Sequence, residues 1–349
     1  MLDDPAALAA NDPSGMLKAV LGLGEQCRAG FRSGRKAVNL PSGDGITDLV
    51  VCGMGGSGVA GDVAHALYRG RLGVPTVVNK TPELPEFCTK DSLVVASSYS
   101  GDTAETLACF EEATGRGCRV VAVTSGGELG RRAWSQGVGV VEVPSGFQPR
   151  AAVGHLAFGV LGALESMGVV PALGAEVELV ARLLDGLGEL IGPGVPTESN
   201  PAKAIAAEIG DRLPVVWGAV GIGAVAASRW RTELNENAKV PAFAGELPEL
   251  DHNEVVGWSA GVGDRFVLLT LRHALEHPDV EARFPVSVEV ARASGMSHRE
   301  VRAEADTPLS CLMWLVMLGS AVSVYLAALR GVDPTPIDAI ARIKRELGG

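Results

Sequence analysis

The sequence predicts an α/β protein built from two mainly parallel sheets in tandem, each with helices on both faces. Short apolar runs without polar alternation, such as residues 49–52 and 93–96, are typical of strands that are covered on both sides. Such runs alternate with glycine- or serine-rich turns and helical patterns, as in strand–helix–strand units. A chain of 349 residues is long enough for two such domains.

The composition limits the class of protein. A hydrophobic fraction of 47% and 45 glycines suit large cores joined by many tight turns. The net charge of −11 argues against a nucleic-acid partner, which would require a basic surface. The six cysteines contain no C-x-x-C pair, so we expect reduced, buried thiols in a cytoplasmic protein. The acidic first 15 residues lack the layout of a signal peptide.

The first half of the chain predicts a five-stranded parallel sheet. After a helix at 16–29, we expect strands at 49–52, 76–78, 93–96, 119–123 and 138–143, and helices at 59–68, 105–114, 129–135 and 153–167. We assign residues 1–167, including the leading helices, to an N-terminal domain. Residues 168–200, with a helix at 176–190, are expected to link it to the next domain.

The second half, residues 201–349, predicts a similar domain. A strand at 213–218 leads through a glycine-rich turn into a helix that begins near Gly223, and further parallel strands are expected at 265–270 and 286–290. This helix carries a cluster of charged residues, most of which we interpret as a solvated face with i, i+4 pairs. The cluster consists of Arg229, Arg231, Glu233, Glu236 and Lys239.

Two loops of the first domain have the residue types of a ligand site. Residues 50–62 read VVCGMGGSGVAGD, in which Gly53, Gly55 and Gly58 satisfy the dinucleotide fingerprint G-x-G-x-x-G. That fold places an acid about 20 residues further on for the ribose hydroxyls, but the next strand ends at Asn79 and Lys80. We therefore interpret the glycines as allowing the backbone to approach a sugar ring.

The second loop lies in residues 93–106, LVVASSYSGDTAET, where a buried strand turns into a helix. Ser98, Ser100 and Thr103 place hydroxyl groups around Gly101 at the helix start. Free N–H groups, the positive end of the helix dipole and O–H donors together suit a phosphate monoester. A well-capped helix after a strand would give the same pattern. Because the two loops follow neighbouring strands, both can face one crevice.

Together, GMGGSG and SYSGDT resemble the loops of the sugar isomerase (SIS) family, which hold phosphosugars. The resemblance implies two tandem SIS-type domains. It also implies that Gly56, Ser57, Ser98, Ser100 and Thr103 bind the sugar and its phosphate.

Arg150 is the one charged residue of the loop GFQPRAAVGH, residues 146–155. A cation at a helix start is mildly unfavourable to the dipole, which favours a functional role over that of a surface arginine. An oxyanion contact is the role we assign, as stabiliser of an enediolate.

The sequence TELNENAKVPAF, followed by PELDHNEVVGW, resembles the bifunctional phosphoglucose/phosphomannose isomerase branch of the SIS proteins. The two motifs stand in the family's order and at its spacing, with His252 16 positions after Glu236. The resemblance implies that Glu236 is the base that moves a proton between C1 and C2, and that His252 helps to open the sugar ring. Such chemistry requires a carboxylate for the proton and a group that titrates near neutrality at the ring oxygen. A capping or surface histidine is the alternative for His252.

Lys344 is similar in placement to a C-terminal lysine that the family uses beside the sugar ring, although a lysine in the last turn of a helix at 337–347 is nearly as good a description. The other histidines have no ligand-like spacing with acids or cysteines, so we expect no metal. The resemblance also implies a reaction without cofactor.

Residues 309–329 form a run of 21 residues without a charge, which is long enough to span a bilayer. Serines within the run and the rest of the composition favour a buried helix instead, and we expect no membrane partner. Such a helix must be covered on all sides, by its own sheet and by a second subunit. We therefore expect a homodimer, and the resemblance implies that His252 reaches the neighbouring subunit's sugar.

The sequence thus favours an isomerase that interconverts glucose 6-phosphate, and mannose 6-phosphate, with fructose 6-phosphate through a cis-enediol. A non-catalytic sugar-phosphate-binding SIS protein and an isomerase of another phosphosugar are the alternatives. One departure concerns Asp102, where the family often has Asn. Its carboxylate either faces away from the phosphate or weakens phosphate binding.

Overall fold

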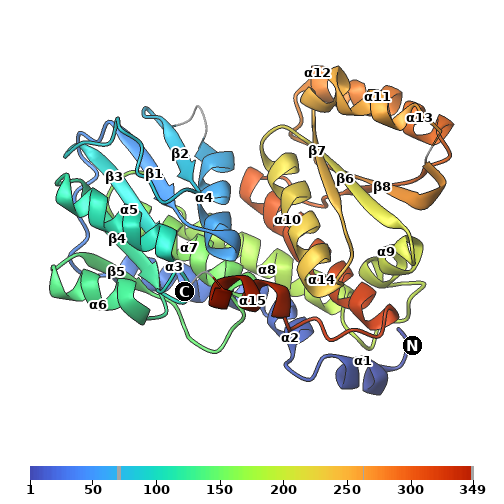
Figure 1. Ribbon diagram of the computed structural model, residues 1–349, viewed down its shortest axis with the longest axis horizontal. Helices are drawn as coiled ribbons and strands as arrows, with labels where there is room; N and C mark the ends of the chain where they lie inside the picture. Colours follow the sequence, from blue (N-terminus) through green and yellow to red (C-terminus); the bar gives the residue numbers. More distant parts are fainter. Residues whose placement is uncertain (69–71, 262, 347–349) are drawn as a thin grey trace. The chain divides into compact units, whose positions relative to one another are not determined.

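The computed structural model describes residues 1–68, 72–261 and 263–346, and Figure 1 follows them along the chain. These residues form two compact units. One is Gly22–Arg182, and the other combines Met1–Leu21 with the described residues from Leu183 onward. The leading helices α1 (Pro5–Asn11) and α2 (Met16–Leu21) therefore group with the second sheet, whereas the sequence led us to expect them with the first.

The first unit contains the expected five-stranded sheet. Its strand order is β2-β1-β3-β4-β5, and all neighbours pair in parallel. The strands are β1 (Asp48–Cys52), β2 (Thr76–Asn79), β3 (Ser92–Ser97), β4 (Arg119–Thr124) and β5 (Gly139–Glu142). The helices are α3 (Leu23–Lys36), α4 (Gly55–Tyr68), α5 (Ala104–Gly115), α6 (Gly127–Ser135) and α7 (Val153–Ser166), with a 3-10 turn, η1 (Pro149–Ala152), before α7.

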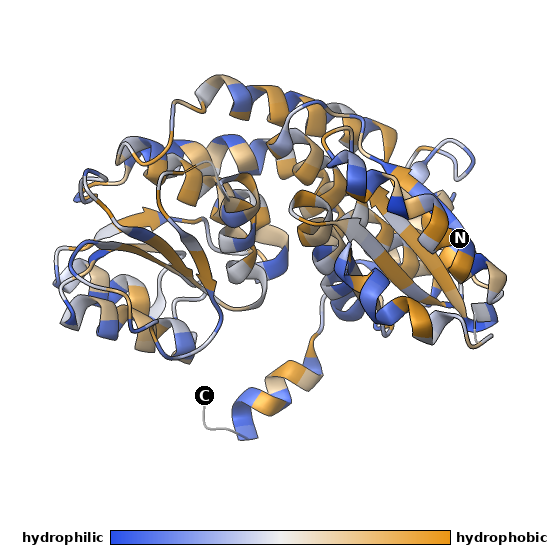
Figure 2. Ribbon diagram, turned by 90° about the horizontal axis from the view of Figure 1, so that it is seen from above, coloured by the Kyte–Doolittle hydropathy of each residue, from blue (hydrophilic) through white to orange (hydrophobic). Residues whose placement is uncertain are grey.

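Alternate residues of this sheet pack against helices on opposite faces. Val94 and Val120 share a core with Phe110 of α5 and Leu129 of α6, and α4 and α7 cover the other face. Helices α3 and α7 pack closely. A Cβ atom added at Gly34 of α3 would lie 2.1 Å from the carbonyl oxygen of Gly159 in α7. Figure 2 shows hydrophobic residues both on strands of each sheet and on many of the helices.

The second unit holds a four-stranded parallel sheet with the order β7-β6-β8-β9. Its strands are β6 (Leu213–Ala219), β7 (Phe243–Leu247), β8 (Phe266–Arg272) and β9 (Ser297–Arg302). Its helices are α9 (Pro201–Ile209), α10 (Ile222–Asn237), α11 (Glu254–Trp258), α12 (Pro278–Glu281), α13 (Arg283–Ala293), α14 (Pro308–Leu329) and α15 (Asp338–Glu346), with 3-10 turns η2 (Glu249–His252) and η3 (Gly263–Arg265). Helix α8 (Gly174–Leu190) runs from the first unit into the second.

The strand expected at 286–290 is wrong, because these residues belong to helix α13. Alternating valines in this segment mimic a strand. The buried residues Phe284, Ser287, Val288 and Ala291 instead follow helical spacing, and Val286 is 64% exposed. The outer strands β7 and β9 did not stand out in the sequence.

The charged face expected on α10 is also partly wrong. Arg229 and Glu233 form the expected i, i+4 ion pair, but both side chains are only 3% exposed. Glu233 further accepts a hydrogen bond from Asn237 Nδ2 at 2.7 Å, and Asn237 is fully buried. This side of α10 therefore forms a buried polar seam against α14 and not a solvated surface.

Helix α14 is the expected buried apolar helix. By length and composition it could cross a membrane, but 94% of its most apolar window is buried inside the chain. The Trp230 indole donates to the carbonyl of Leu315 at 2.8 Å, and Tyr325 donates to the carbonyl of Ile191 at 2.6 Å. Helices of its own unit cover α14, so the expectation that a second subunit is needed to cover it is wrong.

Candidate active site

The two loops expected to bind the substrate lie side by side at the carboxyl ends of β1 and β3. These strands are parallel neighbours, and their loops are joined by hydrogen bonds. The Tyr99 backbone N–H donates to Ser57 Oγ at 2.9 Å, and Ser97 Oγ donates to the Ser57 carbonyl at 3.3 Å. Ser57 is only 5% exposed in the first turn of α4. Gly56 and Ser57 are therefore held against the serine-rich loop.

The serine-rich loop gathers three hydroxyl groups at the start of α5. Ser98 Oγ lies 2.9 Å from Thr103 Oγ1 and accepts the Gly101 N–H at 3.1 Å. Ser100 is exposed, and its Oγ accepts the Asp102 N–H at 3.2 Å. Within the described chain, the Thr103 side chain makes no capping hydrogen bond to α5. The helix start thus combines uncapped N–H groups with hydroxyl donors, as an oxyanion site requires.

The Asp102 carboxylate contacts the start of a neighbouring helix. Its Oδ1 accepts the backbone N–H of Glu128 at 2.9 Å and so caps the first turn of α6. The carboxylate is occupied at a neighbouring helix start, where a negative charge is favourable. Of the two alternatives that the sequence left open for Asp102, this geometry favours the outward-facing one.

Arg150 is not a surface residue. It lies in η1 and is 2% exposed. The backbone there touches α4, since a Cβ atom added at Gly56 would lie 2.9 Å from the Arg150 nitrogen. The structure therefore brings Arg150 together with Gly56, Ser57 and the serine-rich loop in one unit.

Tyr99 connects this loop to the segment before Arg150, and the sequence did not single it out. Its hydroxyl donates to the Pro144 carbonyl at 3.0 Å and accepts the Phe147 N–H at 2.8 Å. Burial raises the pKa of Tyr99, so its hydroxyl stays protonated and keeps donating. The sequence did contain a signal for the role of Tyr99, because it is a single aromatic residue among small and hydroxyl-bearing neighbours.

Glu236 lies in the last turn of α10, in the second unit, and is half-buried. Asn235 Oδ1 accepts the Ala242 N–H at 3.0 Å, and Asn237 Nδ2 donates to Ser323 Oγ of α14 at 2.9 Å. Lys239 Nζ donates to the Glu236 carbonyl at 2.7 Å. These contacts fix the backbone on both sides of the carboxylate, as a proton-transfer group requires.

His252 ends η2 and is exposed. Neighbouring residues anchor the turn that carries His252. Leu250 is 2% exposed and packs into the core of the second sheet. Glu254 Oε1 accepts hydrogen bonds from the indoles of Trp217 at 3.1 Å and Trp258 at 3.0 Å. The imidazole thus stands on a fixed turn and points to solvent.

Glu236 and His252 lie at opposite ends of the strands of the same sheet. Strands β6 and β7 are parallel and are joined by α10, so the last turn of α10 lies near the amino-terminal ends of the strands. His252 follows the carboxyl end of β7, whose 5 residues span about 16 Å. One chain therefore places the two groups at opposite ends of β7, about the length of this strand apart.

Lys344 is exposed on α15, and none of the described residues of this helix is buried. Helix α15, next to the C label in Figure 2, carries both apolar and polar residues on its surface. The expected helix at 337–347 is confirmed over Asp338–Glu346, whereas Leu347 lies outside the described residues. The structure brings Lys344 into contact with none of the other expected site residues that it describes in this unit.

Several other titratable groups lie wholly or partly inside the fold. The six cysteines, all within the described residues, form no disulfide, and five of them are buried. Burial lowers the pKa of His155 and His273, and burial and Arg292 lower the pKa of His298 to about 4. Among residues 1–68, 72–261 and 263–346, no group of three His, Cys, Asp or Glu side chains is arranged to hold a metal ion.

Comparisons with known proteins address the family. The model of the bacterial phospho-glucose isomerase C-terminal SIS domain matches residues 198–347. The chain is 32% identical over 335 residues to the bifunctional phosphoglucose/phosphomannose isomerase of Caldicellulosiruptor bescii, covering 95% of this chain and 98% of that protein. The chain belongs to the bifunctional phosphoglucose/phosphomannose isomerase family.

The family member of that name from Aquifex aeolicus is 38% identical over 301 residues, which are 86% of this chain and 90% of that protein. A crystal structure of a hypothetical protein from Thermus thermophilus aligns with a TM-score of 0.72 over 96% of this chain and 91% of that one. At 16% identity, this likeness concerns the fold alone. The family and the tandem SIS-type α/β fold expected from the sequence are thus confirmed.

Proposed function

We propose that this chain is a cofactor-independent aldose–ketose isomerase that interconverts glucose 6-phosphate and mannose 6-phosphate with fructose 6-phosphate. The observation that carries the proposal is the rigid, half-buried Glu236 at the end of α10 in a member of this family. Both 2-epimeric aldoses lose their C2 proton to give the same enediol, so one carboxylate can serve both.

The phosphate binds at the start of α5. There the helix dipole, the N–H groups of the first turn and the hydroxyls of Ser98, Ser100 and Thr103 favour a dianion. Gly56 allows α4 to pack against the backbone of Pro149 and Arg150, whereas the sequence led us to expect it to make room for the sugar. Ser57 is held beside the serine-rich loop, where we place the sugar. A chain with a net charge of −11 thereby concentrates its positive potential at the ligand.

Isomerisation proceeds by transfer of one proton between adjacent carbons. His252 protonates the ring oxygen while the C1 hydroxyl loses its proton, so the ring opens to the aldehyde. Glu236 then removes the C2 proton, and the C2–H electron pair forms the C1–C2 double bond as the carbonyl oxygen becomes the enediolate. The C1 oxygen is then protonated as the C2 hydroxyl loses its proton, and return of the proton from Glu236 to C1 leaves the C2 carbonyl of the ketose. Arg150 stabilises the negative enediolate oxygen, and Lys344 assists ring opening.

The active unit is a homodimer with shared sites. Its support is the separation of Glu236 from His252 along β7, about 16 Å for 5 residues. A hexose is too short to bridge this distance with both groups in contact with C1, C2 and the ring oxygen. A second copy related by two-fold symmetry would supply His252 to the first copy's Glu236, and receive the same in return.

Replacement of Glu236 by Gln tests the chemistry. It keeps the size of the side chain but removes the base, so turnover should fall by about 10²–10⁴-fold or more while phosphosugar binding persists. Deuterium uptake from D₂O into the product should fall in parallel. The exposed Glu304→Gln is the matched control. Near wild-type turnover in Glu236→Gln would refute the assignment.

Parallel assays with several phosphosugars separate the alternatives. Binding of hexose 6-phosphates without turnover by the parent enzyme would indicate a sugar-phosphate-binding protein. Turnover of a different phosphosugar alone would indicate another isomerase. Comparable kcat/KM for glucose and mannose 6-phosphates is the expected result.

A further inference from the structure

We infer that Asp251, Arg283 and Ser287 form a clamp that positions His252 for sugar-ring opening. The three residues are positioning residues, because they act through the neighbouring imidazole and not on the sugar. The inference rests on the proposed function, in which His252 is the ring-opening group.

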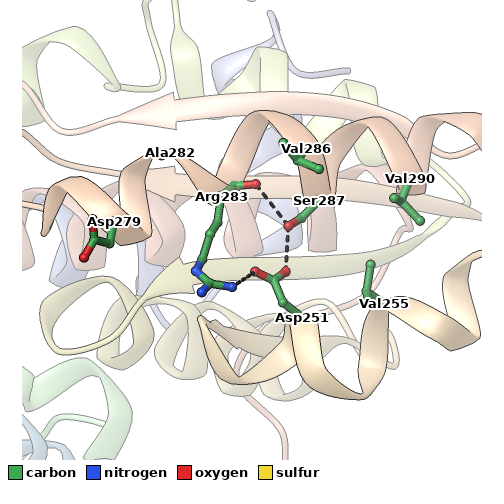
Figure 3. A pocket seen from close by; sticks show the side chains of 8 residues that line it. All are labelled: Asp251, Val255, Asp279, Ala282, Arg283, Val286, Ser287 and Val290. Atoms are coloured by element: carbon green, nitrogen blue, oxygen red, sulfur yellow. Dashed lines mark hydrogen bonds and ion pairs between the residues drawn. The ribbon is translucent and has the colours of Figure 1, made fainter.

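The clamp joins η2 to α13. Ser287 Oγ lies 2.6 Å from Asp251 Oδ1, and Arg283 Nη1 lies 3.2 Å from Asp251 Oδ2. Figure 3 shows both α13 side chains directed at the same carboxylate. The Asp251 side chain is only 15% exposed, so these two donors take the place of much of its water. Hydrogen bonds to a charged and partly buried acceptor are among the stronger ones in proteins.

The turn that carries His252 depends on such side-chain anchors. It is a 3-10 turn of 4 residues, and its backbone hydrogen bonds are long, at 3.2 Å from the Asp251 N–H to the Pro248 carbonyl and 3.3 Å from the Asn253 N–H to the Leu250 carbonyl. Turns of this kind have poor hydrogen-bond geometry and are weak alone. The direction of the His252 side chain is therefore set by what holds its neighbours.

Other anchors hold the segment to the core without the clamp. Leu250 is buried on one side, and Glu254 on the other side accepts from the indoles of Trp217 and Trp258. A Cβ atom at Gly245 of β7 would lie 2.9 Å from Glu254 Oε2, so the backbone makes room for this carboxylate. Loss of the clamp should thus leave the segment folded and change mainly the rotation of η2 about these anchors.

The surroundings of the clamp argue against a separate ligand role. The clamp lies in an open groove of about 650 Å³ between α11 and α13, lined by Val255, Val286 and Val290. Among the described residues that line it, Arg283 is the one cation, and Asp251 and Asp279 share the groove with it. An arginine that is already paired with Asp251, in a groove that also holds a second carboxylate, is a poor anion site. The contacts of Arg283 and Ser287 with Asp251 account for both side chains.

The test removes each donor separately. Ser287→Ala deletes one oxygen, and Arg283→Gln removes the cation. Each should lower kcat for glucose 6-phosphate by between about 10- and 100-fold, as expected when a catalytic group is misplaced. KM should change less than threefold, because the phosphate binds elsewhere. Ser287→Thr, which keeps the hydroxyl, should restore most of the rate. Arg292→Gln, at the other end of α13, is the matched control.

A double-mutant cycle with His252→Ala separates positioning from a general structural role. A hexose phosphate also opens its ring slowly without catalysis, so His252→Ala should keep a measurable rate. Adding Ser287→Ala or Arg283→Gln to His252→Ala should then lower kcat less than twofold, because the group on which the clamp acts is already gone. Thermal melts should show folded protein in every case.

Two results would overturn the inference alone: additive losses in the cycle, or clamp variants with wild-type kcat while His252→Ala is impaired. Wild-type activity of His252→Ala would overturn the inference together with the role of His252 in the proposed function. Absence of isomerase activity in the parent enzyme, despite bound phosphosugar, would overturn both as well.

Discussion

Glu236 and His252 lie at opposite ends of the strands of one sheet, so an assay of mixed dimers can decide whether the sites are shared. A Glu236→Gln chain lacks the base, and a His252→Ala chain lacks the ring-opening group, so each homodimer should be inactive or nearly so. In a mixed dimer with shared sites, one site carries both defects and the other carries neither. One intact site per mixed dimer follows from two-fold symmetry.

The expected recovery can be calculated. Random reassortment of equal amounts of the two chains makes half of the dimers mixed, and half of the sites in these dimers are intact. Activity should therefore reach about a quarter of the wild-type value per total site. If each site used the Glu236 and His252 of one chain, every site would keep a defect and no recovery would occur. The single-chain alternative would have to bridge the 5 residues of β7, about 16 Å.

The two chains would be refolded together and assayed by coupling product formation to a dehydrogenase. Differently tagged chains would show that subunits have exchanged, and light scattering would report the oligomeric state. A mixture of Glu236→Gln with the double variant Glu236→Gln/His252→Ala is the control, because it can form no intact site. A monomer, or no recovery after verified exchange, would refute the shared-site reasoning and leave the role of Glu236 unaffected.

Three further predictions concern phosphate binding, packing and pH. Ser98→Ala with Thr103→Val should raise KM for phosphosugars and remove the stabilisation by inorganic phosphate in thermal melts, because it deletes the hydroxyl pair that is 2.9 Å apart. Gly319→Ala should lower the free energy of unfolding by about 1–3 kcal/mol in urea titrations, because the new Cβ would lie 2.2 Å from the Trp230 indole. His298, whose folded pKa is about 4, should destabilise the fold as pH falls from about 6.5 to 4, by at most about 3 kcal/mol, since the unfolded state then binds more protons.

Each of these predictions has a control and a contradicting outcome. Unchanged phosphate stabilisation in the double variant would move the site elsewhere, and a clear melt shift with NAD would revive the dinucleotide interpretation of the glycines. Gly186→Ala in α8, where a Cβ meets nothing within 4 Å, should not destabilise the chain. His298→Gln should flatten the acid limb of the stability curve, and an unchanged limb would contradict the assignment to His298.

The sequence predicts those features that local pattern determines. Central strands such as β1 and β3 are buried on both faces, so their apolar runs are visible without knowledge of the fold. The edge strand β9 reads SHREVR, and its polar residues hide it, because on one side no strand of the described chain pairs with it. The valines of α13 alternate by chance, and only packing against the sheet shows that Phe284 and Ala291 lie on one helical face.

The features that the sequence did not predict depend on contacts between residues far apart in the chain. The charges of Arg229 and Glu233 are the same in sequence whether they face water or α14, and Ser323, which meets their neighbour Asn237, is 86 residues away from it. Asp251 likewise meets Ser287 across 36 residues. The roles of Glu236 and His252 could be recognised early because their motifs resemble a family, although their separation by β7 is visible only in the structure.

The grouping of residues 1–21 with the chain from residue 183 onward has a consequence for biosynthesis. Residues 22–182 contain a complete sheet with its helices, so this unit can fold while the ribosome is still adding the remainder. In the other unit, α1 and α2 are synthesised first, but they cannot pack against α14 until residues 308–329 have been made. During that interval the faces of α9 and α10 that pack against α14 lack their apolar cover, which makes the nascent chain a substrate for chaperones. A stop codon within α14 should therefore yield aggregated protein from which proteolysis releases a folded fragment close to residues 22–182.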